Sequence, residues 1–171
     1  IRFFSFFTIL SNIMVAFCLS MQWKNTDERK INFWLSANTK TAIAVYIAVV
    51  GIVYNLLLRF LWAPSGMQKI VDELLHLVIP VLFLVYWMMF VPKQNLQWKN
   101  AFAWLWFPFF YLAYTLIRGA LTDHYPYPFL DAYNHGYPKV MMASGIILLL
   151  FLLISFLFIG AGRFFSRKSS L

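Results

Sequence analysis

Residues 140–162 read VMMASGIILLLFLLISFLFIGAG, which is 23 consecutive residues without a charged side chain. An α-helix rises 1.5 Å per residue, so about 20 apolar residues are enough to cross the hydrocarbon core of a bilayer. The stretch therefore predicts a membrane-spanning helix. It is followed by a tail with Arg163, Arg167 and Lys168, and such a cluster of positive charges is typical of the point where a chain stops crossing the membrane.

Four further stretches meet the same criterion: residues 3–23, 41–62, 70–91 and 101–121. The connectors between them are short and polar, and no linker, internal repeat or low-complexity tract divides the chain. We therefore expect an all-α fold, a polytopic transmembrane helical bundle that forms a single domain over residues 1–171. Five of its helices are visible in this sequence.

The composition excludes several classes of protein. Only 12% of the residues are charged and 62% are hydrophobic, whereas soluble domains carry about 25% charged residues, so a soluble enzyme is excluded. The single cysteine, Cys18, cannot form an intrachain disulfide, a thiol redox pair or a zinc cluster. The net charge of +8 is spread in ones and twos beside apolar runs, unlike a nucleic-acid-binding patch. We expect no nucleic-acid partner.

The distribution of positive charge predicts the orientation. Lys and Arg are enriched in cytoplasmic loops because their translocation is disfavoured. The first and third connectors and the tail together carry nine of these residues, whereas the opposite side carries five: Arg2, Arg59, Lys69, Arg118 and Lys139. We therefore expect a cytoplasmic C-terminus and an external start at Ile1. A cytoplasmic N-terminus would require one more helix upstream, so we infer six helices in the intact protein.

Polar residues inside a span cost free energy unless they are paired, hydrated or functional. Counted from the outer side, Thr8 lies about 10 Å deep and His76 about 9 Å deep, so the two share a level. Asp72 and Glu73 stand four and three residues before His76 and fall on its side of the helix. Other polar residues occupy the outer parts of their helices: Asn12, Asn55, Arg59, Thr115 and Arg118. Together they predict one polar pocket that opens outward.

For several of these residues a structural role is the simpler interpretation. Asn and Thr in membrane helices commonly bond a backbone carbonyl or a neighbouring helix, which accounts for Asn12, Asn55 and Thr115 taken singly. The charged residues stand close enough to the interface to be solvated. His76 has no easy route to water, and a functional role is favoured for it.

His76 could serve several kinds of site. A b-type haem needs two facing histidines, but His124 and His135 both lie in the last connector, so we expect no haem. No HxxxH or HExxH spacing supports a metal site, and we expect neither a metal nor another cofactor. A hydroxyl nucleophile needs only an imidazole at its own depth and a carboxylate that orients the ring. Thr8, His76 and Asp72 fit that pattern.

Three segments resemble a known family: FFTILSNIMVAF at 6–17, DELLHLVIPVLF at 72–83 and YPYPFLD at 125–131. They are similar to the FAR-17a-like androgen-induced and ADTRP family of membrane hydrolases and its bacterial six-helix relatives. LAYTLIRGAL at 112–121 strengthens the resemblance to the bacterial branch. The resemblance covers the whole visible chain, and YPYPFLD is its most specific motif.

This resemblance implies that the protein is an integral protein of a bacterial plasma membrane. It also implies an enzymatic activity. Animal members are threonine hydrolases that cleave fatty acid esters of hydroxy fatty acids with an intramembrane Thr and His. By motif, the nucleophile position falls on Thr8 and the base position on His76. Where the animal proteins carry an amide ahead of the histidine, this chain has Asp72, which suits an acid that orients the ring.

We therefore expect hydrolysis of a membrane lipid ester. In this hypothesis Thr8 attacks the acyl carbon, His76 takes and returns the proton, and Asp72 or Glu73 orients the imidazole. Two further candidates, Asn12 and Arg118, would stabilise the oxyanion or hold a free carboxylate of the substrate.

The alternative is a transporter of protons or a small solute, or an accessory subunit without chemistry of its own. An outward pocket with Asp72, Glu73, His76 and Arg118 could pass protons or bind an anion. Transport folds usually show an internal repeat with broken helices, and the chain has no matching halves. Protein partners cannot be inferred from the sequence.

The last connector, 122–139, is rich in Pro and Tyr. The segment Tyr125–Phe129 supplies rigid rings and fixed backbone angles, which predicts a lid over the outer mouth with a structural rather than a catalytic role. We expect Asp131 to point toward a basic partner such as Arg118.

Overall fold

The structure is a computed structural model that describes residues 3–24, 33–61 and 63–168, with side chains as far as residue 165. In these ranges every regular element is helical. The α-helices are α1 (Phe7–Lys24), α2 (Ala37–Val53), α3 (Met67–Glu73), α4 (Ile79–Phe90), α5 (Asn100–Trp104), α6 (Trp106–Thr122), α7 (Ala132–His135) and α8 (Tyr137–Lys168). Short 3-10 turns lie at η1 (Phe3–Ser5), η2 (Phe33–Leu35) and η5 (Pro128–Leu130). Two π-helical turns, η3 (Tyr54–Leu58) and η4 (Leu74–Val78), extend α2 and join α3 to α4.

Four continuous helical stretches are long and apolar enough to cross a membrane: Ala37–Leu58, Met67–Phe90, Asn100–Thr122 and Tyr137–Phe165. The predicted all-α membrane bundle is therefore confirmed. The first predicted span, 3–23, is also helical, as α1, but it is not one of these four. Ser11, Asn12 and Gln22 make α1 more polar than the other long helices.

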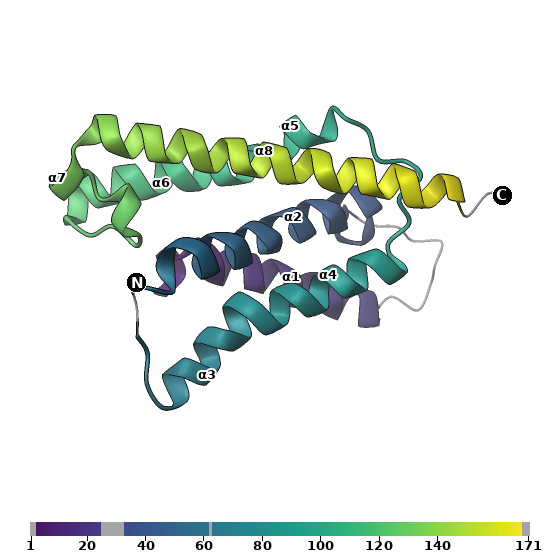
Figure 1. The fold of residues 1–171 in the computed structure, drawn as a ribbon, viewed down its shortest axis with the longest axis horizontal. Coiled ribbons are helices and arrows are strands. Elements are labelled where there is room, and N and C mark those ends of the chain that lie inside the picture. Colours follow the sequence, from purple (N-terminus) through teal and green to yellow (C-terminus); the bar gives the residue numbers. More distant parts are fainter. Residues whose placement is uncertain (1–2, 25–32, 62, 169–171) are drawn as a thin grey trace.

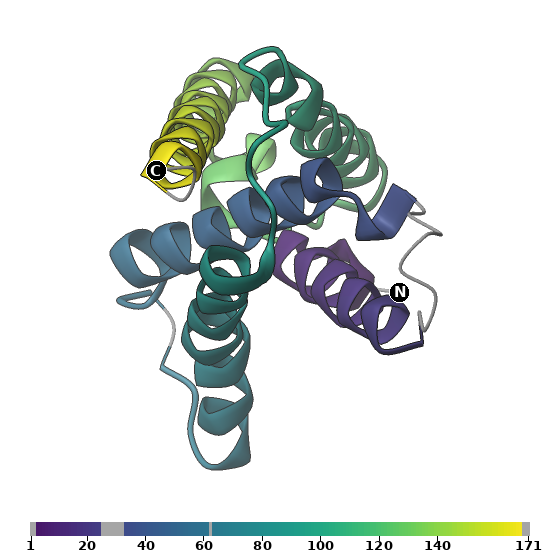
Figure 2. The same cartoon turned by 90° about the vertical axis from the view of Figure 1, so that its right-hand side faces the viewer.

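Helix α2 forms the centre of the bundle. Figure 2 looks along the long axis of the bundle and shows α1, α4 and the pair of α6 and α8 around α2. Every residue from Thr39 to Val50 is buried, and three alanines in that segment allow neighbouring helices to approach closely. A close approach occurs at Gly51, where a Cβ atom would lie 3.3 Å from the backbone oxygen of His76. Gly51 therefore sets the distance between α2 and the helix that carries His76.

The outer helices expose large apolar side chains. Those on α4, α6 and α8 include Leu82, Met89, Phe110, Ile117, Leu149 and Leu157. Soluble monomers rarely expose contiguous apolar faces of this kind, whereas helices that meet lipid need no polar outer face. The exposed faces therefore agree with a bundle surrounded by hydrocarbon.

Proline residues inside the helices leave backbone carbonyls without their usual donor. Pro108 has no amide hydrogen, so the carbonyl of Trp104, four residues earlier, receives no helical bond from it. The hydroxyl of Tyr46 donates to that oxygen across 2.7 Å, and both side chains are buried. A tyrosine on the central helix thus compensates for the proline in α6.

This compensation predicts a stability effect that depends on Pro108. Replacing Tyr46 with Phe leaves a buried carbonyl unpaired and should cost about 1 to 3 kcal/mol, seen as a lower unfolding temperature in detergent. With Pro108→Ala already present, the new amide can bond to Trp104, so Tyr46→Phe should cost clearly less. Equal losses in the two backgrounds would contradict the assignment.

The start of α1 is anchored at one end of the bundle. The ring of Phe7 packs edge-on against Tyr46, Tyr111 and Phe151 with centroids 5.1 to 6.3 Å apart. The Tyr111 hydroxyl donates to the backbone oxygen of Ser5 across 2.8 Å. Figure 1 shows the start of α1 at the same end as α7, with the C-terminus at the opposite end. These contacts fix the position of Thr8, the next residue in α1.

Candidate active site

Thr8 and His76 face each other across the interface of α1 and the η4 turn. Thr8 Oγ1 and His76 Nε2 are 3.3 Å apart, so the two residues that were predicted to share a level also face each other. Thr8 is 7% exposed and the His76 side chain 13%. The catalytic roles of the two residues remain a prediction.

Asp72 holds the other nitrogen of the imidazole. His76 Nδ1 lies 2.9 Å from the backbone oxygen of Asp72 and 3.2 Å from its Oδ1. Both oxygens are acceptors, so Nδ1 carries the hydrogen and Nε2 has its lone pair directed at Thr8. In this tautomer the Thr8 hydroxyl donates to Nε2, which is the arrangement that a general base requires.

Tyr54 is a member of the site that sequence reasoning missed. Its ring stacks on the His76 imidazole, with centroids 3.7 Å apart and planes 15° apart. Its hydroxyl donates to Asp72 Oδ2. The ring therefore limits movement of the imidazole, while the hydroxyl orients the carboxylate. Its position beside the polar Asn55 was the only signal in the sequence.

Asn12 and Asn55 donate hydrogen bonds to backbone carbonyls that lack a helical donor near His76. Pro80 has no amide hydrogen for its α-helical partner, the His76 carbonyl, or for its π-helical partner, the Leu75 carbonyl. Asn55 donates to the first across 3.3 Å and Asn12 to the second across 3.2 Å. π turns often mark functional sites, and this one carries the histidine.

Asn12 has no hydrogen left for an oxyanion. Its amide nitrogen also donates to the Thr8 backbone oxygen across 2.8 Å, so its two hydrogens serve Thr8 and Leu75. The predicted alternative role, a bridge to backbone carbonyls, describes what Asn12 does in this structure. Its effect on the site is to hold α1 and η4 in register.

Glu73 and Arg118, also predicted as site residues, make no hydrogen bond or ion pair with the imidazole in the part of the chain that the structure describes. Glu73 pairs with Arg59, which in turn donates to Asn55 Oδ1 across 2.5 Å. Arg118 is half-buried on α6 and does not line the pocket described below. Among the described contacts, none joins either residue to Thr8 or His76.

The loop between α6 and α8 covers the site but not as predicted. Asp131 does not pair with Arg118: its carboxylate accepts from the backbone and side-chain nitrogens of Asn134 at 3.0 and 2.7 Å and so caps the short helix α7. The prediction of a basic partner was wrong because the Asp131 carboxylate instead accepts hydrogen bonds at the N-terminus of α7. The bonds with Asn134 also lower the pKa of the Asp131 carboxyl.

Tyr127, from the same loop, reaches Thr8. Its hydroxyl oxygen lies 3.3 Å from the Thr8 backbone nitrogen and 3.4 Å from Thr8 Oγ1. Its ring stacks on Phe129 with centroids 5.2 Å apart and meets Phe6 edge-on at 5.9 Å. The connector was predicted to be a purely structural lid, and its contact with the candidate nucleophile was missed.

An apolar pocket adjoins Thr8. It has about 620 Å³ of empty space, part of it open to the surroundings. Polar groups enter its wall from Thr8, Tyr54, Tyr111, Tyr127 and Ser144. The rest of the lining is apolar: Phe7, Val49, Val50, Val53, Leu58, Pro108, Leu112, Phe129, Leu130, Ile147, Leu148 and Phe151. Thr8 therefore contacts the imidazole and also forms part of a pocket that suits a hydrocarbon chain.

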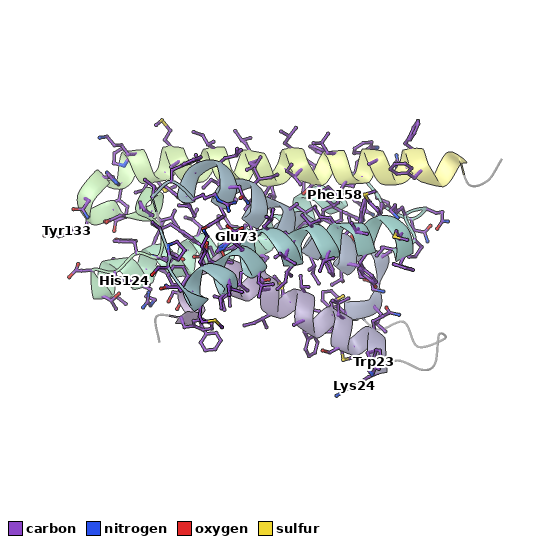
Figure 3. All side chains as sticks on the ribbon, turned by 60° about the horizontal axis from the view of Figure 1, so that its bottom comes forward. Trp23, Lys24, Glu73, His124, Tyr133 and Phe158 are labelled. Carbon is purple, nitrogen blue, oxygen red and sulfur yellow. The ribbon has the colours of Figure 1, made fainter. Side chains whose placement is uncertain are left out.

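The ends of the molecule differ in charge. His124 and Tyr133, from the loop that covers the site, lie at one end, and Trp23 and Lys24 lie at the other (Figure 3). The four described carboxylates belong to α3 and to the loop segment: Asp72, Glu73, Asp123 and Asp131.

Across the described residues no three His, Cys, Asp or Glu side chains come together as a metal site would require.

Comparison of the chain with protein-family models, with curated proteins and with solved structures finds no match. The chemistry of the site must therefore be inferred from its geometry.

Proposed function

We propose that this protein is an intramembrane hydrolase of lipid esters with Thr8 as its nucleophile. The observation that carries the proposal is the chain of contacts from Thr8 Oγ1 to His76 Nε2 and from His76 Nδ1 to Asp72, at 3.3 and 3.2 Å. A hydroxyl, an imidazole and a carboxylate in this order form the arrangement that activates a weak nucleophile. The adjoining apolar pocket gives the acyl chain a place to bind.

The proposed reaction has two steps. Thr8 Oγ attacks the acyl carbonyl carbon while His76 Nε2 accepts the hydroxyl proton, and the tetrahedral intermediate collapses when His76 returns that proton to the departing alcohol. Water then attacks the acyl-threonine with His76 as base. This second step releases the carboxylic acid and restores the Thr8 hydroxyl, so both protons are accounted for.

The resemblance to the FAR-17a-like androgen-induced and ADTRP family stays part of the proposal. Each of the three segments that carry it, 6–17, 72–83 and 125–131, contributes a residue to the same site. These residues are Thr8, His76 and Tyr127. Three segments that are far apart in the sequence thus meet at one site. This is expected if a single function depends on all three.

Covalent labelling tests the proposal. A fluorophosphonate with an alkyl chain should label the detergent-solubilised protein, and peptide mass spectrometry should place the adduct on Thr8. Thr8→Ala and His76→Ala should each abolish the adduct, whereas Thr122→Ala, which changes an exposed threonine far along α6, should not. An adduct of equal yield in Thr8→Ala protein would reject Thr8 as the nucleophile.

We also propose that the site lies in the outer half of the membrane and that the C-terminus is cytoplasmic, because of the charge distribution along the connectors. A reporter enzyme that is active only in the cytoplasm should be active when fused after Leu171. The same reporter placed within residues 122–139 should be inactive. The reverse pattern would overturn the orientation without affecting the proposed chemistry.

A further inference from the structure

Tyr127 occupies a position that the proposed reaction needs to fill, because its hydroxyl lies beside the reacting oxygen of Thr8. The negative oxygen of a tetrahedral intermediate requires a donor held in advance at the place where charge develops. Both amide hydrogens of Asn12 are engaged by carbonyl oxygens, and Arg118 does not line the pocket. Tyr127 lines the pocket and has its hydroxyl beside the reacting oxygen of Thr8.

The hydrogen bonds around Thr8 fix the role of each atom. The Thr8 backbone N–H lies in the first turn of α1, where amide hydrogens have no acceptor within the helix. It donates instead to the Tyr127 hydroxyl oxygen across 3.3 Å. The Thr8 hydroxyl donates to His76, which leaves its oxygen as the acceptor for Tyr127. The Tyr127 hydroxyl can therefore donate to the nucleophile, and the neighbouring Tyr111 hydroxyl is its other hydrogen-bond partner.

The length of this last contact indicates what the hydroxyl is placed to bind. Good O–H···O bonds measure about 2.5 to 3.0 Å, and the 3.4 Å between Tyr127 Oη and Thr8 Oγ1 is longer. When Thr8 has attacked, the negative oxygen is attached to the same carbon as Thr8 Oγ, one atom further into the pocket. Because the contact with Thr8 is long, the Tyr127 hydroxyl is free to transfer its hydrogen bond to that oxygen, and the bond would then strengthen in the transition state.

The surroundings of Tyr127 keep the donor in place and protonated. Its backbone is extended, with φ −130° and ψ 141°, and Pro128 follows it, so the chain has little freedom there. One residue pair earlier, the Tyr125 ring lies directly over Gly119, where any Cβ atom would come within 2.0 Å of it. Burial raises the pKa of the Tyr127 phenol, which keeps its hydrogen available.

We propose that Tyr127 is a catalytic residue whose hydroxyl stabilises the oxyanion formed on the ester carbonyl, with its own oxygen held by the Thr8 backbone N–H at the start of α1. The inference rests on the proposed hydrolase function. It adds a donor from the connector, whose role had been assigned to structure alone. The helix dipole of α1 places partial positive charge at the same point.

Tyr127→Phe tests this role because it removes the hydroxyl and keeps the ring. With a chromogenic long-chain ester in detergent, kcat should fall by about 10² to 10³-fold, as when an oxyanion donor is lost in other hydrolases, with KM little changed. Affinity for a non-hydrolysable ether analogue of the ester, which has no carbonyl, should equal that of the unmodified protein. Tyr133→Phe, a change at an exposed tyrosine of α7, should leave kcat and KM unchanged.

The possible failures are distinguishable. An unchanged kcat in Tyr127→Phe protein, with Thr8→Ala protein inactive, would overturn the role of Tyr127 and leave the hydrolase intact. A loss of ether-analogue binding or a rise in KM alone would also overturn it, because it would show that the phenol shapes the pocket. Absence of ester turnover by the unmodified protein would reject both proposals.

Discussion

Thr8→Ala and His76→Ala should each reduce turnover of a lipid ester by at least about 10³-fold. Loss of either member of a serine–histidine pair in a well-studied hydrolase costs about 10⁶-fold in kcat, and the 3.3 Å contact places Thr8 and His76 in the same relation. A nucleophile and its base act as one unit. The double variant should therefore be scarcely worse than either single variant, so the effects should not multiply.

Matched controls separate loss of chemistry from loss of fold. Thr122→Ala and His124→Ala replace residues of the same types that do not line the pocket, and both should retain turnover. Thr8→Ser should retain part of it, because the hydroxyl is kept and only a methyl group is removed. Single variants that turn over the ester at the rate of the unmodified protein, in a well-folded preparation, would reject the catalytic pair.

The depth of Thr8 and His76 could be predicted from the sequence, but the direction of their side chains could not. Counting residues along a helix gives height in the membrane, whereas facing sides depend on how helices pack. The spacing of four residues between Asp72 and His76 was informative because it returns close to the same face. Glu73, three residues before His76, turns away to Arg59, since the π turn at η4 widens the helix and carries that spacing further from a full turn.

Prolines offered a signal that was not used. Pro80 predicts unpaired carbonyls at His76 and Leu75, and buried carbonyls in a membrane require donors. That rule would have identified the carbonyls to which Asn12 and Asn55 donate in the structure. Pro108 and Tyr46 follow the same rule.

Contacts made by tyrosine were harder to foresee. Tyr54 lies in an apolar helix, and its role depends on η3 packing beside η4. Tyr127 is 119 residues from Thr8, and no periodicity connects a loop residue with a helix start. Such positions become visible only when the bundle is assembled, which explains why the helices were predicted well and the surroundings of Thr8 less completely.

Asp72→Asn should lower kcat by about 10² to 10³-fold with a smaller effect on substrate binding. In a serine-protease triad the corresponding change costs about 10⁴-fold, because the imidazole adopts the wrong tautomer. Here the backbone oxygen of Asp72 also accepts from Nδ1, at 2.9 Å, and it survives the substitution. It continues to favour the productive tautomer, so the loss should fall below that of the protease and reflect mainly the missing negative charge beside the imidazolium.

Two neighbouring substitutions make this expectation specific. Glu73→Gln should lower kcat far less than Asp72→Asn, because Glu73 pairs with Arg59 and acts on the imidazole only through its charge. Tyr54→Phe keeps the stacked ring and removes the hydroxyl bond to Asp72, so its loss should be smaller than that of Asp72→Asn, about 10-fold. If Glu73→Gln proved as damaging as Asp72→Asn, the net charge at the C-terminal end of α3, and not the orientation of His76 by one carboxylate, would be what catalysis requires.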